Sequence, residues 1–168
     1  MSDLLCCRQF ECKQDDKVNI MSCAHHSQPK PAAEANIDSY ASFISMANAQ
    51  SEPQRLLWVL ARAELPNGYT ETQHQHFLQG NGGALEPVLC VDKLPSEVAD
   101  FASLVAESVQ TGVDWDIAFV ASMSGRAGIA PNSDEAIQPM RLMLNKIQSG
   151  IIAEFLTFDK QGELVSLS

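Results

Sequence analysis

The sequence predicts an α/β fold, a small and mostly parallel sheet of about five strands flanked by helices and closed by a C-terminal antiparallel hairpin. Apolar residues form 45% of the 168-residue chain, which is enough for a hydrophobic core. Continuous apolar runs, typical of strands covered on both faces, alternate along the chain with segments of helical periodicity. Strands that alternate with helices indicate crossover connections, and crossovers produce a parallel sheet.

The first 35 residues differ in composition from the rest. They contain four of the five cysteines and show neither helical nor strand periodicity. Their last part, 27–35 (SQPKPAAEA), is typical of a linker because its two prolines interrupt helices and ladders. We therefore expect a disordered or loosely attached tail over 1–35 and a single α/β domain over 36–168. Met21 is a second candidate for the natural start of the chain.

The first half of the expected domain begins with a helix. Asn36 or Asp38 can cap it, and apolar residues then recur at helical spacing. The segment 55–64 (RLLWVLARAE) has a continuous apolar core and predicts a buried strand. A helix is the alternative for this segment, since Leu, Ala and Arg are good helix formers. A turn at 66–68 (PNG) and a short helix over 70–79 follow.

The second half continues the alternation and closes with a hairpin. Asn132 and Glu135 form a capping-box pattern at a helix start. The turn DKQG at 159–162 joins the last two pairing segments. The expected elements of this half are a strand at 85–92, a helix at 95–112, a strand at 115–122, a loop at 124–131, a helix at 132–150 and pairing segments at 152–158 and 163–167.

The charge of the chain excludes some classes of partner. It has 11 Lys and Arg against 21 Asp and Glu, so its formal net charge is −10. Binding to nucleic acid backbones depends on Lys and Arg, and anionic lipid repels an acidic surface. No apolar run reaches the roughly 18 residues that span a bilayer, and no basic segment precedes an apolar one at the start. We expect a soluble cytosolic protein that binds neither nucleic acid nor membrane.

Cysteine and histidine supply few metal-site candidates. The tail holds soft ligands at Cys6, Cys7, Cys12, Cys23, His25 and His26. The pair Cys23 and His25 is too closely spaced for a zinc knuckle, and no apolar residues are available to pack around one. His74 and His76 are two apart, which places them on different faces of a helix. The sequence therefore predicts no metal site and no cofactor.

Motifs for covalent catalysis are missing from the body of the chain. Cys90 lies in the apolar run VLCV and is expected to be a small core residue. Asp114 and Asp116 would share one face of a strand, but they are more simply its polar start. No nucleophile elbow, zinc-protease helix or Cys-x-x-Cys pair occurs. We predict no catalytic residue from the sequence.

In parallel sheets ligands bind beyond the carboxyl ends of the strands, so the loops after two of the expected strands are the best candidates for a binding site. Asp92 and Lys93 follow one strand, and the segment SGRAG follows the next. That segment offers small residues, backbone donors and one Arg at the approach to a helix, a chemistry that suits an anion or phosphate. The candidate binding residues are Asp92, Lys93, Ser124, Gly125, Arg126 and Gly128.

Several stretches of the body resemble a family of small bacterial proteins that often carry the label "ribonucleotide reductase subunit alpha". The stretches are NIDSYASFISMANAQ at 36–50, QRLLWVLARAELP at 54–66, GGALEPVLCVDKLP at 82–95, WDIAFVASMSGRAG at 115–128 and FLTFDKQGELV at 155–165. The resemblance covers 36–168 and implies no residue roles. Reductase chemistry needs several cysteines, and this part of the chain has only Cys90, so we do not expect that activity.

Two functions agree with these observations. The first is a small non-catalytic accessory or protein-interaction module, with self-association or a partner protein meeting the edge strand of the C-terminal hairpin. The alternative is a binder of, or an enzyme acting on, a small anionic metabolite or nucleotide through Arg126 and the loop around it.

Overall fold

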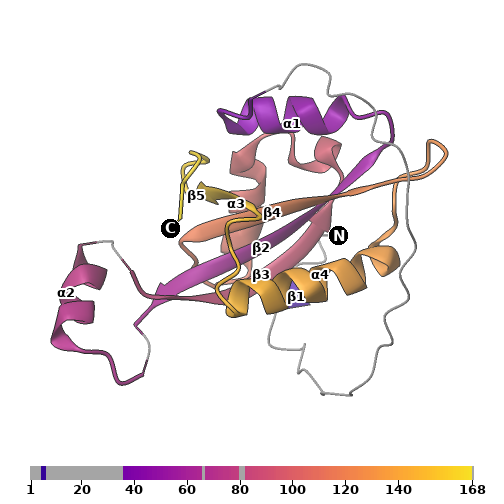
Figure 1. Cartoon of the computed structure of the whole chain (residues 1–168). Coiled ribbons are helices and arrows are strands. Elements are labelled where there is room, and N and C mark those ends of the chain that lie inside the picture. The colour runs from indigo at the N-terminus through magenta and orange to yellow at the C-terminus, as the bar shows by residue number, and fades with distance from the viewer. Residues whose placement is uncertain (1–4, 7–35, 66, 80–81, 168) are drawn as a thin grey trace, which may run out of the picture.

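The computed structural model describes residues 5–6, 36–65, 67–79 and 82–167 and places them around one sheet (Figure 1). The strand order in this sheet is β1-β3-β2-β4-β5. Four strands form its body, and the two-residue β1 lies outside them at the β3 edge. The strands are β1 (Leu5–Cys6), β2 (Gln54–Glu64), β3 (Ala84–Lys93), β4 (Ile117–Ser124) and β5 (Leu156–Asp159).

The expected parallel arrangement is wrong, because every strand pair in the described sheet is antiparallel. The error begins at α2 (Glu71–Leu78), which was expected to belong to a crossover. Glu64 at the end of β2 lies opposite Ala84 at the start of β3, so β2 and β3 form a long ribbon with α2 at its tip. Figure 1 shows α2 standing away from the sheet and its other helices. A helix between two strands indicates a parallel pair only if it crosses the sheet.

The connection from β3 to β4 does cross the sheet, but it leaves β2 between these two strands, so they are not hydrogen-bonded neighbours. The chain from β3 returns through α3 (Phe101–Gln110) and enters β4 on the other side of β2. Strands β3 and β4 therefore run in the same direction with β2 between them. Helix α4 (Ser133–Gln148) then leads to β5, which pairs with the outer side of β4.

Helices cover both faces of the sheet. The first face packs against α1 (Tyr40–Asn48), α3 and the 3₁₀ turn η2 (Pro95–Val98), and the second packs against α4. Residues Leu56–Ala61 of β2 are almost fully buried, alternately against the two layers. The prediction of a buried strand in this segment is confirmed, and the helix alternative is wrong. Burial on both faces explains why an antiparallel strand has a continuous apolar run.

Aromatic rings fill the core of the first face. Tyr40 packs edge-on against Phe101 with ring centroids 5.1 Å apart, and Trp58 and Phe158 contact both. The Tyr40 hydroxyl donates to the carbonyl of Val98 at 2.5 Å and so joins α1 to η2. Burial raises the pKa of this phenol well above its usual value.

The ends of the helices follow local capping chemistry. The N-cap of α1 is Ser39, whose hydroxyl accepts from the N–H of Ser42, so the expected caps Asn36 and Asp38 are wrong. The capping box of Asn132 and Glu135 is confirmed at the start of α4. The helix expected over 95–112 divides into η2 and α3, because Asp100 caps a new helix at Phe101.

The C-terminal end forms a shorter pairing than expected. β5 covers four residues, and the return segment meets it through a bridge between Phe158 and Leu164. The turn that begins at Asp159 is present, with Gly162 at φ +81°. Val165 donates to the carbonyl of Thr157, so this segment covers the outer side of β5.

Candidate functional site

The structure separates two neighbouring candidate residues, Asp92 and Lys93. Successive side chains of a strand point to opposite faces. The Asp92 carboxylate lies on the α4 side, where it accepts from Arg55 Nη1 at 2.5 Å and from Ser133 Oγ at 2.8 Å. Lys93 lies on the other side and pairs with Glu107 of α3 at 3.0 Å. These two side chains therefore do not line one pocket.

Both side chains are engaged in holding helices on the sheet. Arg55, which also donates to the carbonyl of Pro131, links the start of β2 to the loop before α4. Lys93 is only 7% exposed, and Glu107 supplies its counter-charge within the first layer. A ligand that bound to either group would have to displace an ion pair inside the protein.

Ser124 and Gly125 lie at the end of β4. The Ser124 hydroxyl accepts from the Gln54 amide at 3.0 Å across the β2–β4 pair. The N–H of Gly125 donates to the carbonyl of Pro53 at 2.8 Å. A Cβ at position 125 would lie 2.1 Å from the carbonyl oxygen of Ile129, so only glycine fits this close approach.

Arg126 and Gly128 belong to a tight turn that extends from the end of β4. Arg126 and Ile129 exchange two backbone hydrogen bonds, and the two residues between them have positive φ, +54° at Ala127 and +76° at Gly128. This is the conformation of a type I′ turn. The N–H of Gly128 donates to Glu52 Oε2 at 2.7 Å, which fixes the turn to the loop before β2.

Arg126 stands out among the cations that the structure describes. Its side chain is exposed, and within residues 36–65, 67–79 and 82–167 no hydrogen bond or ion pair engages its guanidinium. Five of the other six Lys and Arg side chains in those ranges form ion pairs with Asp or Glu, and the sixth residue, Arg141, is also engaged in an interaction. Arg126 is thus the candidate residue whose charge is available to a partner molecule.

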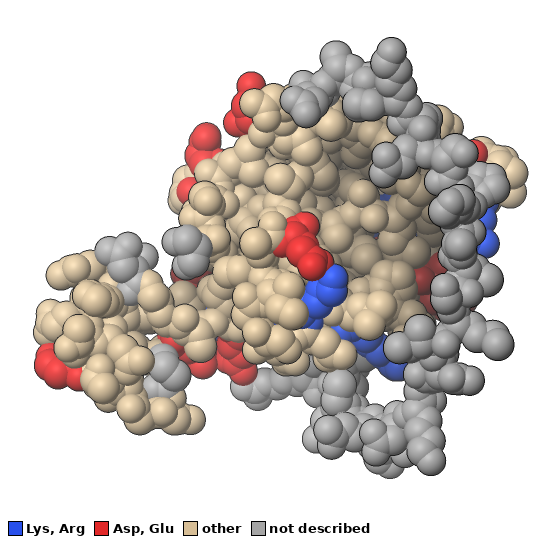
Figure 2. Space-filling model, viewed as in Figure 1, with Lys and Arg blue, Asp and Glu red and all other residues tan. Residues whose placement is uncertain are grey.

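A groove that the sequence did not predict lies beside this turn, between α1 and the outer half of β4. It has a volume of about 490 Å³. Its lining residues are Ile37, Phe43, Met46, Ala47, Gln50, Gln54, Val120, Ala121, Ser122, Ser124, Glu154 and Leu156. Most of the surface seen in Figure 2 is neither acidic nor basic, and Glu154, paired with Lys146, is the charged residue in the groove lining. Apolar and small polar groups therefore dominate the groove.

The backbone of β4 is only partly paired on the groove side. The described pairing with β5 ends where Val120 lies opposite Leu156, whereas β4 continues to Ser124 (Figure 1). Residues 153–155 turn away, with the N–H of Phe155 donating to the carbonyl of Ile152. The stretch Ala121–Ser124 is thus an edge of the sheet, bounded by Leu156 at one end and by the Arg126–Ile129 turn at the other. We call this stretch the open edge.

The direction of the open backbone groups follows from the ladder. In an antiparallel pair each residue directs its N–H and C=O to the same neighbouring strand, and successive residues alternate. The N–H of Gly125 points to β2, so the N–H and C=O groups of Ser122 and Ser124 point away from β2. Within the described ranges these four groups have no backbone partner, and both residues are exposed. The open edge therefore presents two donors and two acceptors to solvent.

The side chains beside the open edge complete the site. Ser122 and Ser124 share the sheet face of Val120, which packs in the core under α1. A strand placed next to the open edge would direct every second side chain to the same face, next to Phe43, Met46 and Ala47 of α1. The arrangement combines a backbone ladder with an apolar wall, and such an arrangement can bind an extended peptide.

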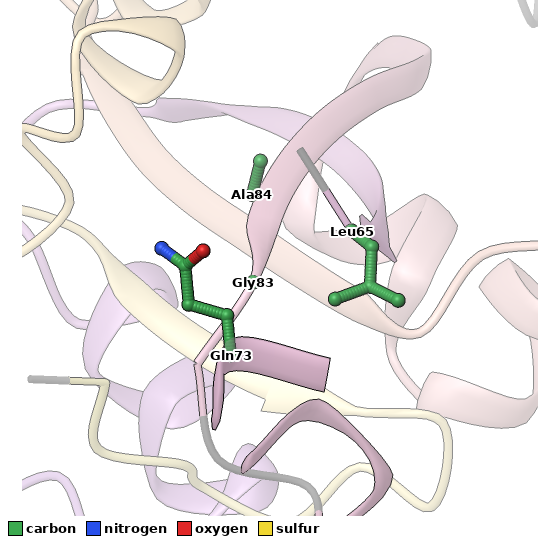
Figure 3. A pocket seen from close by; sticks show the side chains of 4 residues that line it. All are labelled: Leu65, Gln73, Gly83 and Ala84. Atoms are coloured by element: carbon green, nitrogen blue, oxygen red, sulfur yellow. The ribbon is translucent and has the colours of Figure 1, made fainter. Parts of the chain in front are cut away.

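A second, smaller pocket lies at the base of α2. It has a volume of about 150 Å³ and is lined by Leu65, Gln73, Gly83 and Ala84 (Figure 3). The Gln73 amide already accepts from the N–H of Thr70 in the cap of α2. This pocket offers no charged or nucleophilic side chain.

The His and Cys residues considered as candidates do not form a common site among the described residues. The ring centroids of Tyr69 and of His74 on α2 lie 5.3 Å apart, and Cys90 is buried in β3. Among the described residues no group of three or more His, Cys, Asp or Glu side chains could hold a metal ion. Cys7, Cys12, Cys23, His25 and His26 lie outside those residues, as does most of the expected tail.

In the part of the chain that the structure describes, no helix combines the length and the apolar composition needed to cross a membrane. Comparison with protein-family models, with curated proteins and with solved structures finds no match to this chain.

Proposed function

We propose that this protein is a small accessory module that binds an extended segment of a partner protein by strand addition at the open edge. The observation that carries the proposal is that the N–H and C=O groups of Ser122 and Ser124, in line with the β4–β5 ladder, have no backbone partner among the described residues. Edge strands with free backbone groups are templates for pairing with another chain. Pairing from Ala121 to Ser124 would span about 14 Å of strand.

The groove wall supports the same function. Main-chain hydrogen bonds give strand addition its affinity, and pockets for alternate side chains give it specificity. Phe43, Met46 and Ala47 of α1 form an apolar wall on one side of the open edge. A bound segment would therefore carry apolar side chains at the two positions opposite Ser122 and Ser124, and polar side chains between them.

Labelled, end-blocked heptapeptides with an alternating core test the proposal by fluorescence anisotropy. In this panel the first and third core positions are Val, Ile, Leu or Phe, and the second and fourth are Thr. We expect at least one member to bind, and N-methylation of its first and third core amides to abolish binding, because those amides would donate to Ser124 and Ser122. N-methylation of the second and fourth amides is the matched control and should leave binding intact.

Two variants of the protein make the test specific to the open edge. Ser122→Pro removes one N–H that points to the groove, and we expect binding to weaken at least about tenfold. Ser122→Ala keeps the backbone donor and should bind like the wild type. If no peptide binds, or if both variants bind equally well, the proposed function is wrong.

A second candidate function is the binding of a small anionic metabolite or nucleotide at the Arg126 turn. It is supported by the exposed guanidinium without a partner in the described ranges. A ligand that binds only the native state raises the melting temperature. Nucleotides and phosphorylated metabolites should therefore stabilise the wild type and not Arg126→Ala, and a flat response across such a panel excludes this candidate.

A further inference from the structure

The two ends of the open edge differ in charge. Arg126, whose guanidinium has no partner among the described residues, lies two residues beyond Ser124, at the end where the chain turns. Glu154 lines the groove near the other end, where Leu156 begins β5, and its carboxylate is paired with Lys146. A positive charge is therefore available at one end of the edge and not at the other.

The direction of strand pairing determines which end of a bound segment lies near the positive charge of Arg126. β5 runs antiparallel to β4, and a segment that extended β5 along the open edge would keep this direction. Its N-terminal end then lies next to the Arg126 turn, and its C-terminal end lies next to Leu156 and Glu154. An acidic residue in the N-terminal flank would meet the exposed guanidinium of Arg126, whereas one in the C-terminal flank would approach Glu154.

We propose that the open edge selects an extended partner segment with Asp or Glu in the N-terminal flank that precedes its paired residues, and that Arg126 binds this carboxylate. The inference rests on the proposed strand addition and adds the chemistry and the direction of the partner. Arg126 is suited to the role because its main chain is fixed by the turn, while its exposed side chain has no partner within the described ranges. A planar guanidinium also binds carboxylates with two parallel hydrogen bonds.

Two peptides that differ only in the placement of charge test the proposal. One has Asp before the alternating core and Lys after it, and the other has Lys before and Asp after. We expect the first to bind about fivefold more tightly at low salt, and this preference to shrink as salt is added. Arg126→Glu should reverse the preference, and the Arg126→Gln variant should remove it. Arg62→Glu, at the opposite end of β2, is the matched control and should leave the preference unchanged.

The outcomes separate this proposal from the one on which it rests. Equal binding of both peptides, with loss of binding in Ser122→Pro, refutes the acidic-flank preference and leaves strand addition intact. A preference for the peptide with Asp after the core contradicts the antiparallel direction. Failure of both peptides and of the wider panel to bind overturns strand addition itself.

Discussion

The carboxylate of Asp92 accepts a hydrogen bond from the guanidinium of Arg55 at 2.5 Å, between the end of β3 and the start of β2. The same carboxylate accepts from the hydroxyl of Ser133 at the start of α4, so one group joins two strands and a helix. The side chains are 14% and 21% exposed, and each is therefore largely removed from water. This contact holds the end of the sheet from which the Arg126 turn extends.

Removal of the Asp92 carboxylate should destabilise the fold. Asp92→Ala leaves the Arg55 charge without its partner in a partly buried place, and we expect a loss of about 2 kcal/mol in the free energy of unfolding. Urea denaturation measures this loss. The control is Glu154→Ala, whose exposed pair with Lys146 should contribute less than about 1 kcal/mol. Equal effects of the two substitutions would show that Asp92 does not hold the sheet end.

The buried phenol of Tyr40 should make the fold sensitive to alkali. Its pKa is raised in the folded state by burial, and the hydroxyl also donates to Val98. Above a pH of about 10 the unfolded chain loses this proton while the folded chain keeps it, so stability falls as pH rises. The fall from this one group should approach about 1.4 kcal/mol per pH unit.

Tyr40→Phe provides the comparison for this pH dependence. The variant should be about 1 kcal/mol less stable at neutral pH, because the hydrogen bond to Val98 is lost. Its stability should fall less steeply than that of the wild type above pH 10. Parallel curves for the two proteins, measured by chemical denaturation across this range, would contradict a buried and un-ionised Tyr40.

Two proline substitutions test the direction of the β4 backbone groups. Ala121 directs its N–H to β2, whereas Ser122 directs its N–H to the groove. Ala121→Pro should therefore remove a ladder bond and destabilise the protein by about 3 kcal/mol, while Ser122→Pro should have an effect below about 1 kcal/mol. Thermal and urea denaturation measure both. The opposite order would mean that the alternation along β4 is reversed and that the open edge lies elsewhere.

The turn beside the open edge depends on Gly125. A methyl group there would lie within 2.9 Å of two backbone carbonyls, those of Ile129 and Pro53. Since backbone on both sides resists displacement, we expect Gly125→Ala to cost about 2 to 3 kcal/mol. Gly150→Ala is the control, because position 150 has a positive φ but no atom within 4 Å of an added Cβ. A smaller effect at 125 than at 150 would show that the turn adjusts to the methyl group.

The buried strand around Trp58 and the cap at Asn132 were predictable because both depend on local sequence. A continuous apolar run and a capping box each consist of residues that lie close together in the sequence. The direction of the strands depends instead on whether α2 crosses the sheet. Helix α2 has no buried residue and does not cross, and a short polar helix gives little sign of this in its sequence.

The open edge could not be predicted from the sequence for a similar reason. The open edge exists because the β4–β5 register places Leu156 opposite Val120, and these two residues are far apart in the sequence. The local signal is weak and consists of small polar residues at 122 and 124 on a face that is otherwise apolar. Arg126 was predicted as a binding residue, and its place in the structure gives it a different suggested partner. Asp92 and Lys93 are adjacent in sequence, but strand alternation sends them to opposite faces.

Amide hydrogen exchange at single residues, measured by NMR with and without the acidic-flank peptide, tests the open edge most directly. In the free protein the amides of Ser122 and Ser124 should exchange fast, while those of Ala121 and Met123 exchange slowly because they donate to β2. The peptide should slow the exchange at Ser122 and Ser124 at least tenfold and leave their neighbours unchanged. Slow exchange at these two serines in the free protein, or bound peptide without any change there, would contradict the account.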